Sequence, residues 1–293
     1  FTIKRNPYFV GIDPQGNQLP YIDEIRFTFY ADREALNLAA VAGEIDFQGR
    51  HISMSTYPVL KENENKANYR VVTWPTFGGS DAVVMLNQTW TGPEGEYFRN
   101  KDFRIALSHA IDREAIKELA FYGLGESRQG VPAPFHPYYP GDEYAFRYTE
   151  LDMDKANSLL DGILPNKDSD GFRLMSNGNI LDIEIGIVPQ FGNWPDIGQL
   201  IVENWAEVGV KAHIEIRERT QHFNMRPANE LMSEIWNEDT TGFPFSGQPK
   251  FDPRSDPALT FAPLIAKWYA SGGKEGQVPP AEIKRLVDII DEA

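Results

Sequence analysis

Apolar side chains along the chain follow two periods, one typical of strands and one typical of helices. Alternation of apolar and polar residues predicts strands over residues 22–30, 45–47, 69–74, 81–87, 180–188 and 210–216. Apolar residues spaced three and four apart predict helices over residues 32–42, 101–122, 155–160 and 196–208, and from residue 280 onward. Strands and helices alternate, which predicts an α/β fold with β-α-β units and parallel strands over residues 22–47 and 180–216.

Helix boundaries follow from capping residues. Asp32 and Asp196 are expected to cap the helices that follow them, and Gly43 and Gly209 to end them. Asp112 is expected to start a second helix inside residues 101–122, which would break that segment in two. Turns or loops are predicted over residues 63–68, 88–100 and 128–150.

The amino-acid composition disfavours some classes of partner and excludes some kinds of chemistry. The chain has 28 basic and 43 acidic residues and a net charge of -15, which disfavours nucleic acid and anionic membranes as partners. It contains no cysteine, which excludes disulfides, zinc–thiolate sites, iron–sulfur clusters and thiol nucleophiles. No apolar run approaches the roughly 20 residues that cross a bilayer.

Motifs for catalysis or metal binding are weak. The sequence has no Gly-x-Ser-x-Gly, Ser-x-x-Lys, phosphate loop or His-Glu-x-x-His. Residues 166–171 resemble the start of a calcium loop, but Asn177 stands where a bidentate Glu is needed, which favours a tight Asp- and Gly-rich turn. We therefore expect no metal, no cofactor and no enzyme activity, with an α/β hydrolase as the alternative from another class.

Four segments carry a family resemblance: Asn6-Pro7-Tyr8-Phe9, residues 19–25, residues 42–47 and residues 103–114. In order and spacing they resemble the extracellular solute-binding proteins of peptide-type ABC importers, solute-binding family 5. The resemblance implies a periplasmic-binding-protein-like fold of type II, the peptide-binder kind. It also implies that residues 1–70 close the first lobe and residues 71–293 form most of the second. The chain is thus expected to be a piece that lacks an N-terminal portion.

The same resemblance implies a function. The chain would be the substrate-binding component of an ABC importer, capturing peptides or oligopeptides in a cleft between two lobes that close about a hinge. Its partners would be the ligand and the membrane permease subunits, and it would work as a monomer. Its place would be periplasmic or extracellular, with a lipid anchor as one form of attachment. An oligosaccharide-binding member of the family and a sensor domain with the same fold are the alternatives.

The resemblance also implies ligand-binding residues. In peptide binders of the family, a Trp at a strand end is followed three residues later by an Asp that accepts the ligand's ammonium group. Trp236 and Asp239 match this spacing, with Glu238 beside them. Ser233 stands where some members carry an Arg. Further aromatic residues are expected to wall the cleft: Trp74, Phe77, Trp268 and Tyr269.

Overall fold

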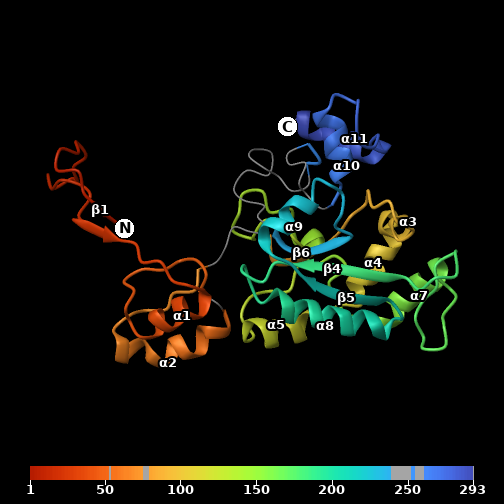
Figure 1. Ribbon diagram of the computed structural model, residues 1–293, viewed down its shortest axis with the longest axis horizontal. Helices are drawn as coiled ribbons and strands as arrows, with labels where there is room; N and C mark the ends of the chain where they lie inside the picture. Colours follow the sequence, from red (N-terminus) through yellow and green to blue (C-terminus); the bar gives the residue numbers. More distant parts are fainter. Residues whose placement is uncertain (53, 75–78, 239–251, 255–260, 293) are drawn as a thin grey trace. The chain divides into compact units, whose positions relative to one another are not determined.

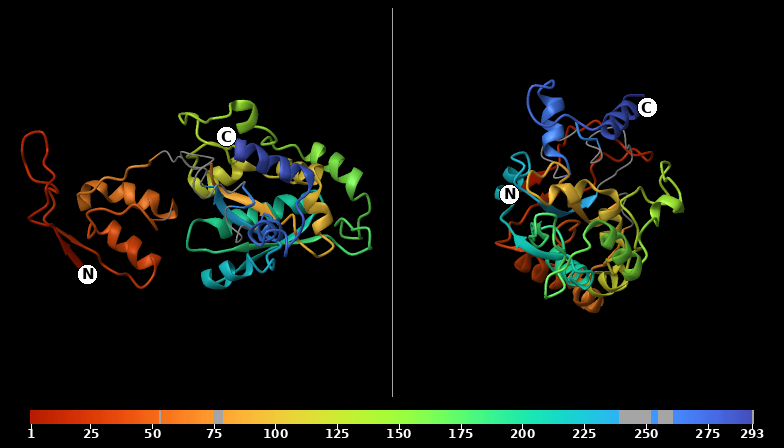
Figure 2. Two further views of the ribbon diagram at one scale, coloured as in Figure 1. Left: turned by 90° about the horizontal axis from the view of Figure 1, so that it is seen from above. Right: turned by 90° about the vertical axis from the view of Figure 1, so that its right-hand side faces the viewer.

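The structure is a computed structural model that describes residues 1–52, 54–74, 79–238, 252–254 and 261–292. It divides into two compact units, residues 1–52 with 56–71 and residues 72–293 with 53–55 (Figure 2). This boundary lies beside the division expected between residues 1–70 and 71–293. The assignment of these two parts to the lobes of a larger protein stays a prediction.

The first unit contains a small hairpin and two helices. Strands β1 (Thr2–Lys4) and β2 (Glu24–Arg26) pair antiparallel, with Ile3 opposite Ile25. Helix α1 (Arg33–Val41) begins as expected, because the Asp32 side chain accepts a hydrogen bond from the Ala35 amide. Helix α2 (Tyr57–Ala67) follows the 3₁₀ turn η1 (Met54–Thr56).

Several predictions for this region are wrong. Residues 45–47 and 69–74 form no strand, and β2 pairs antiparallel with β1, so residues 22–47 are not a β-α-β unit. All three residues of β2 are exposed, so the alternation around Ile25 marks no buried sheet face within this unit. Residues 63–68 are not a turn. Residues 63–67 belong to α2, which ends where Asn68 takes a left-handed conformation.

The second unit is built on a four-stranded sheet of order β3-β6-β4-β5. Its strands are β3 (Ser80–Leu86), β4 (Asp182–Ile187), β5 (Lys211–Ile216) and β6 (Ser233–Glu238). Strand β4 lies parallel to both β5 and β6, which confirms the expected β-α-β unit over residues 180–216. Strand β3 pairs antiparallel with β6.

The two faces of this sheet differ in character. Ile183, Ile185 and Ile187 are fully buried in the core, on the face against which helix α8 (Trp194–Glu207) packs. Alternation places Glu184 and Gly186 of β4 on the opposite face. Helix α9 (Arg219–Met225) covers that face (Figure 1).

Helices α4 (Lys101–His109) and α5 (Arg113–Phe121) confirm the predicted break at Asp112, whose side chain accepts from the Ala115 amide. The loop predicted over residues 88–100 is partly wrong, because it contains helix α3 (Gly95–Arg99). The remaining helices are α6 (Asp142–Ala145), α7 (Met153–Ile163), α10 (Pro263–Ala270) and α11 (Ala281–Glu292). Among the described residues, none of the helices is both long and apolar enough to cross a lipid bilayer.

Two details of the second unit test the capping and turn predictions. Helix α8 begins at Trp194, so Asp196 lies in its first turn and is not the cap. Pro195 explains this earlier start, since proline suits the first helical turn. Asp168 accepts hydrogen bonds from the amides of Asp170 and Phe172, which confirms the tight turn over residues 166–171.

Candidate functional site

One edge of the four-stranded sheet gathers the candidate binding residues. Strands β4, β5 and β6 run parallel, so their carboxyl ends meet at this edge, where ligands bind in open α/β sheets. Phe191 follows β4, Arg217 and Arg219 follow β5, and Trp236 lies near the end of β6. Strand β3 is antiparallel to β6, so the segment of Trp74, which precedes β3, enters the sheet at the same edge.

Trp236 lies in a cluster of aromatic rings. The centroid of its ring is 5.1 Å from that of Phe191, 5.0 Å from that of Trp194 and 5.4 Å from that of Phe223. The Arg226 guanidinium lies 4.3 Å from the same centroid, a cation–π contact. Trp236 keeps partial exposure, so this cluster reaches the surface of the second unit.

Buried charges support the cluster from the α9 face of the sheet. Glu234, on β6, accepts from His222 Nε2 at 2.6 Å and from Arg226 Nη2 at 2.6 Å. Gly186 is the β4 residue opposite Glu234, and a side chain there would meet Arg217 Nη1 at 2.9 Å. The bare glycine therefore makes room for the charged groups, which burial would penalise if they were unpaired.

A second ion pair completes this layer. Arg217 Nη2 donates to Glu184 at 2.7 Å across the carboxyl end of the sheet. With the pair of Arg226 and Glu234, two guanidinium groups meet two carboxylates, so their charges balance. Within the described residues, two buried atoms of the layer, His222 Nδ1 and Arg217 Nη1, have no hydrogen-bond partner.

A cavity of about 690 Å³ lies beside β3 in the second unit. Its lining comes from β3, from sides of α4, α5 and α8, from residues 124–130 and 133–135, and from Trp74. The cavity and the aromatic cluster share β3: Val83 lines the cavity and lies opposite Trp236, and the Asp81 carbonyl accepts from Trp194 Nε1. The two regions thus adjoin the same strand, while Trp236, Phe191 and Phe223 lie outside the described lining of the cavity.

Cationic side chains enter the cavity lining. Arg104 donates to the Phe98 carbonyl, and Arg113 donates to carbonyl and hydroxyl oxygens around it. Burial lowers the pKa of both guanidiniums, and the Glu150 carboxylate partly opposes this at Arg113. Both side chains stay charged at neutral pH, so the cavity wall carries fixed positive charge in an acidic chain.

The structure brings together only some of the predicted site residues. Trp74 lines the cavity with 70% of its surface exposed, and Trp236 lies in the aromatic cluster. Trp268 and Tyr269 form an edge-to-face pair on α10 with ring centroids 4.9 Å apart, outside the cavity lining. Phe77, Asp239 and the side chain of Glu238 lie outside the described residues.

Sequence reasoning missed the residues that surround Trp236, namely Phe191, Phe223 and Arg226. One signal could have found Phe191, because it directly follows a predicted strand whose carboxyl end belongs to the ligand-binding edge. Arg226 and Glu234 gave no such signal, since their pairing depends on how α9 folds over the sheet.

Metal binding finds no support in the described part of the chain. There, no three His, Asp or Glu side chains gather closely enough to hold a metal ion. The arrangement of the site offers aromatic faces, paired charges beneath Trp236 and a cavity, which suit reversible binding of an organic solute.

Solved structures resemble this chain along most of its length. An oligopeptide-binding protein OppA matches 99% of the chain with a TM-score of 0.71 and 33% identity. The periplasmic binding protein MelB of Agrobacterium fabrum C58, solved in complex with stachyose, matches 99% of the chain with a TM-score of 0.71 at 20% identity. The chain spans 49% and 44% of those two proteins. These likenesses define the class: an α/β fold of the periplasmic binding proteins.

Two related proteins found by sequence comparison are also binding proteins. A periplasmic alpha-galactoside-binding protein of Rhizobium meliloti is 30% identical over 63% of this chain and 28% of its own length. The oligopeptide-binding protein AppA of Bacillus subtilis is 28% identical over 58% of this chain and 31% of its own length. The chain therefore matches less than a third of the length of these two relatives.

Residues 1–256 match the bacterial extracellular solute-binding proteins, family 5, in the middle portion of that family. Because the match covers most of the chain, the chain belongs to this family. The resemblance identified from the sequence is confirmed, and so is the expected fold class. The family and the similar structures are solute-binding proteins of transport systems rather than enzymes, so the hydrolase alternative is not favoured.

Proposed function

We propose that this chain forms the ligand-capturing part of the substrate-binding component of an ABC importer. The observation that carries the proposal is the aromatic cluster around Trp236 at the carboxyl edge of the sheet, beside strand β3, which also lines a cavity of about 690 Å³. Residues 1–70 contribute to one lobe and residues 71–293 to the other, and ligand binding closes the two about a hinge.

Peptides or oligopeptides are the first ligand class. In this proposal Asp239 accepts the ligand ammonium, with Glu238 beside it, because a desolvated ammonium needs a charged acceptor. Trp74, Phe77 and Trp236 wall the cleft. Trp268 and Tyr269 of α10, in the same lobe, complete this set of proposed walls. The bound protein then presents its surface to the permease subunits, as a monomer in the periplasm or outside the cell, with or without a lipid anchor.

Neutral oligosaccharides are the second ligand class, favoured by the charges beneath Trp236. The two guanidinium groups there, Arg217 and Arg226, already pair with Glu184 and Glu234. A neutral sugar needs no further cation, and aromatic faces suit the apolar faces of sugar rings. The 30% identical relative that binds alpha-galactosides supports the same class.

Calorimetric titration of the 293-residue chain tests the function and separates the two classes. The panel holds a pentapeptide, a nonapeptide, stachyose and mannohexaose. Heat of binding from the peptides alone supports the first class, and heat from the sugars alone supports the second. Mass spectrometry of the mixtures should recover each probe unchanged. Cleaved products would contradict a transport role, and no binding to any probe would contradict solute capture at this edge.

A further inference from the structure

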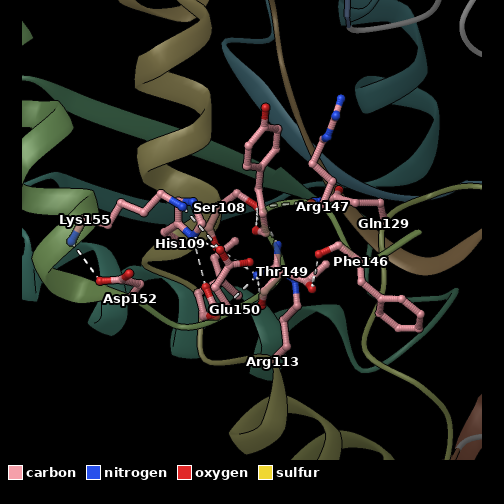
Figure 3. A network of polar contacts seen from close by, with 12 residues as sticks. Ser108, His109, Arg113, Gln129, Phe146, Arg147, Thr149, Glu150, Asp152 and Lys155 are labelled. Atoms are coloured by element: carbon pink, nitrogen blue, oxygen red, sulfur yellow. Dashed lines mark hydrogen bonds and ion pairs between the residues drawn. The ribbon is translucent and has the colours of Figure 1, made fainter. Parts of the chain in front are cut away.

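Arg113, the first residue of α5, joins three separate segments of the second unit (Figure 3). Its Nη1 donates to the Ser108 carbonyl at 2.8 Å, at the end of α4, and to the Thr149 carbonyl at 3.1 Å. Its Nη2 donates to Ser108 Oγ at 2.8 Å. The Ser108 hydroxyl in turn donates to the Tyr148 carbonyl at 2.8 Å. The guanidinium therefore fastens residues 148–149 to the junction of α4 and α5.

Gln129 connects this junction to the wall of the cavity. Its Nε2 donates to the Arg147 carbonyl at 2.7 Å and approaches Ser108 Oγ at 3.5 Å. Its backbone amide donates to the Ala145 carbonyl at 2.7 Å. Gln129 belongs to residues 124–130, which line the cavity, and Ser108 and Arg113 line the cavity too. The contacts around Arg113 thus end on the surface that a solute would touch.

The chemistry of these contacts requires a guanidinium. The acceptors are carbonyl and hydroxyl oxygens that lie in different directions around one half-buried group, and only arginine presents five donors in a planar fork. A lysine would keep the positive charge, but its single ammonium could not reach the Ser108 and Thr149 oxygens in the same geometry.

We propose that Arg113 is a positioning residue for solute capture, which holds residues 126–135 in place as one wall of the binding cavity. It acts through residues 145–149 and Gln129, since its guanidinium donors already serve the oxygens of Ser108 and Thr149. The proposal rests on the proposed function, because it assigns the cavity to the captured solute.

The first test measures the wall in the protein without solute. Hydrogen exchange at the Gln129 amide should accelerate about tenfold or more in both Arg113→Lys and Arg113→Met. Exchange at the Ile185 amide, in the centre of the sheet, should stay unchanged. The matched control is Arg285→Met, because Arg285 is an exposed arginine of the same unit that pairs with Glu292 on its own helix α11. A uniform acceleration at both amides would show a general loss of stability and would overturn the proposal.

Chemical rescue separates positioning from folding. In Arg113→Ala, added n-propylguanidinium supplies the missing donors and should restore slow exchange at Gln129. If exchange at Gln129 is slow in Arg113→Ala before the addition, the wall does not depend on the guanidinium and the proposal fails.

The second test measures capture, with stachyose and a pentapeptide as probes. The probe that the unmodified chain binds should bind about tenfold more weakly to Arg113→Lys, and equally well to Arg285→Met. Faster exchange at Gln129 with unchanged affinity would show that this wall does not serve capture. Binding of neither probe by the unmodified chain would count against the proposed function, and the exchange test would still decide whether Arg113 holds the wall.

Discussion

The Arg226 guanidinium lies 4.3 Å from the centroid of the Trp236 ring while it donates hydrogen bonds from Nε and Nη2 to Glu234. Glu234 and Trp236 are two residues apart on β6, so they lie on the same face of the sheet. One buried carboxylate therefore fixes the cation that covers the ring of the candidate binding residue. The orientation of Trp236 therefore depends on the charges packed beneath its ring.

Loss of this carboxylate should destabilise the second unit strongly. Glu234→Gln leaves Arg226 buried without a counter-ion, which should lower the free energy of unfolding by about 3 kcal/mol. Urea unfolding followed by circular dichroism measures the change, and near-UV circular dichroism reports the altered surroundings of Trp236. The control is Glu143→Gln, whose exposed pair with Arg147 should contribute about 0.5 kcal/mol or less. Equal effects of the two substitutions would contradict the buried pairing.

Two glycines with left-handed backbones allow the cost of backbone strain to be compared with the cost of a steric clash. Gly209 has φ 80°, and a Cβ there would lie 2.6 Å from the Gly171 carbonyl oxygen. Gly178 has φ 83°, with nothing within 4 Å of its Cβ position. Gly178→Ala should cost about 1 kcal/mol from backbone conformation alone. Gly209→Ala should cost about 2 kcal/mol more, because the backbone after α8 must move. Thermal unfolding compares them, and similar losses would contradict the close approach.

Trp74 should matter for capture and little for folding. Its ring is 70% exposed and lines the cavity, so Trp74→Ala should weaken binding of the recognised probe about tenfold, through lost aromatic contact. The free energy of unfolding should change by no more than about 0.5 kcal/mol. Leu119→Ala is the control, since Leu119 is 67% exposed on α5 but does not line the cavity. Titration calorimetry that finds equal affinities for both variants would remove Trp74 from the site.

Acid should weaken the turn around Asp13 in the first unit. Hydrogen bonds from the Asn17 side chain and from the Tyr21 hydroxyl hold the pKa of Asp13 at about 2, below its usual 3.8. The folded pKa is the lower one, so the stabilisation is present above pH 3.8 and is lost as the pH falls through about 2. In Tyr21→Phe the pKa should rise toward 3.8. Carboxyl chemical shifts followed by NMR measure both values, and an unchanged pKa in Tyr21→Phe would contradict the contact.

Local patterns predicted the second unit better than the first. The break at Asp112 and strands β4 and β5 were predictable, because a capping side chain and a two-residue period act within one segment. The β-α-β unit predicted over residues 22–47 was wrong, because the apolar alternation there does not coincide with a buried sheet face in the first unit. Helix α2 was not predicted, because most of its residues are polar and form no apolar stripe. Only Leu60 of this helix is buried.

The site was predictable only in part. The family resemblance placed Trp236 at a strand end, and the structure agrees. Its partners could not be predicted, since His222 and Glu234 meet only after α9 turns back over the sheet. Arg113 likewise lies in a recognised motif, but its contacts with residues 148–149 form across a long irregular segment. Such contacts depend on tertiary packing, which single-sequence patterns do not encode.

The balance between the guanidinium and carboxylate groups beneath Trp236 has a consequence for engineering the protein. Replacing Arg226 alone with an apolar residue would leave the Glu234 carboxylate buried without a counter-ion. Replacing Glu234 alone would leave the Arg226 guanidinium in the same position. New selectivity at this edge is therefore accessible through coordinated double substitutions, whereas single changes at these positions should yield strongly destabilised chains.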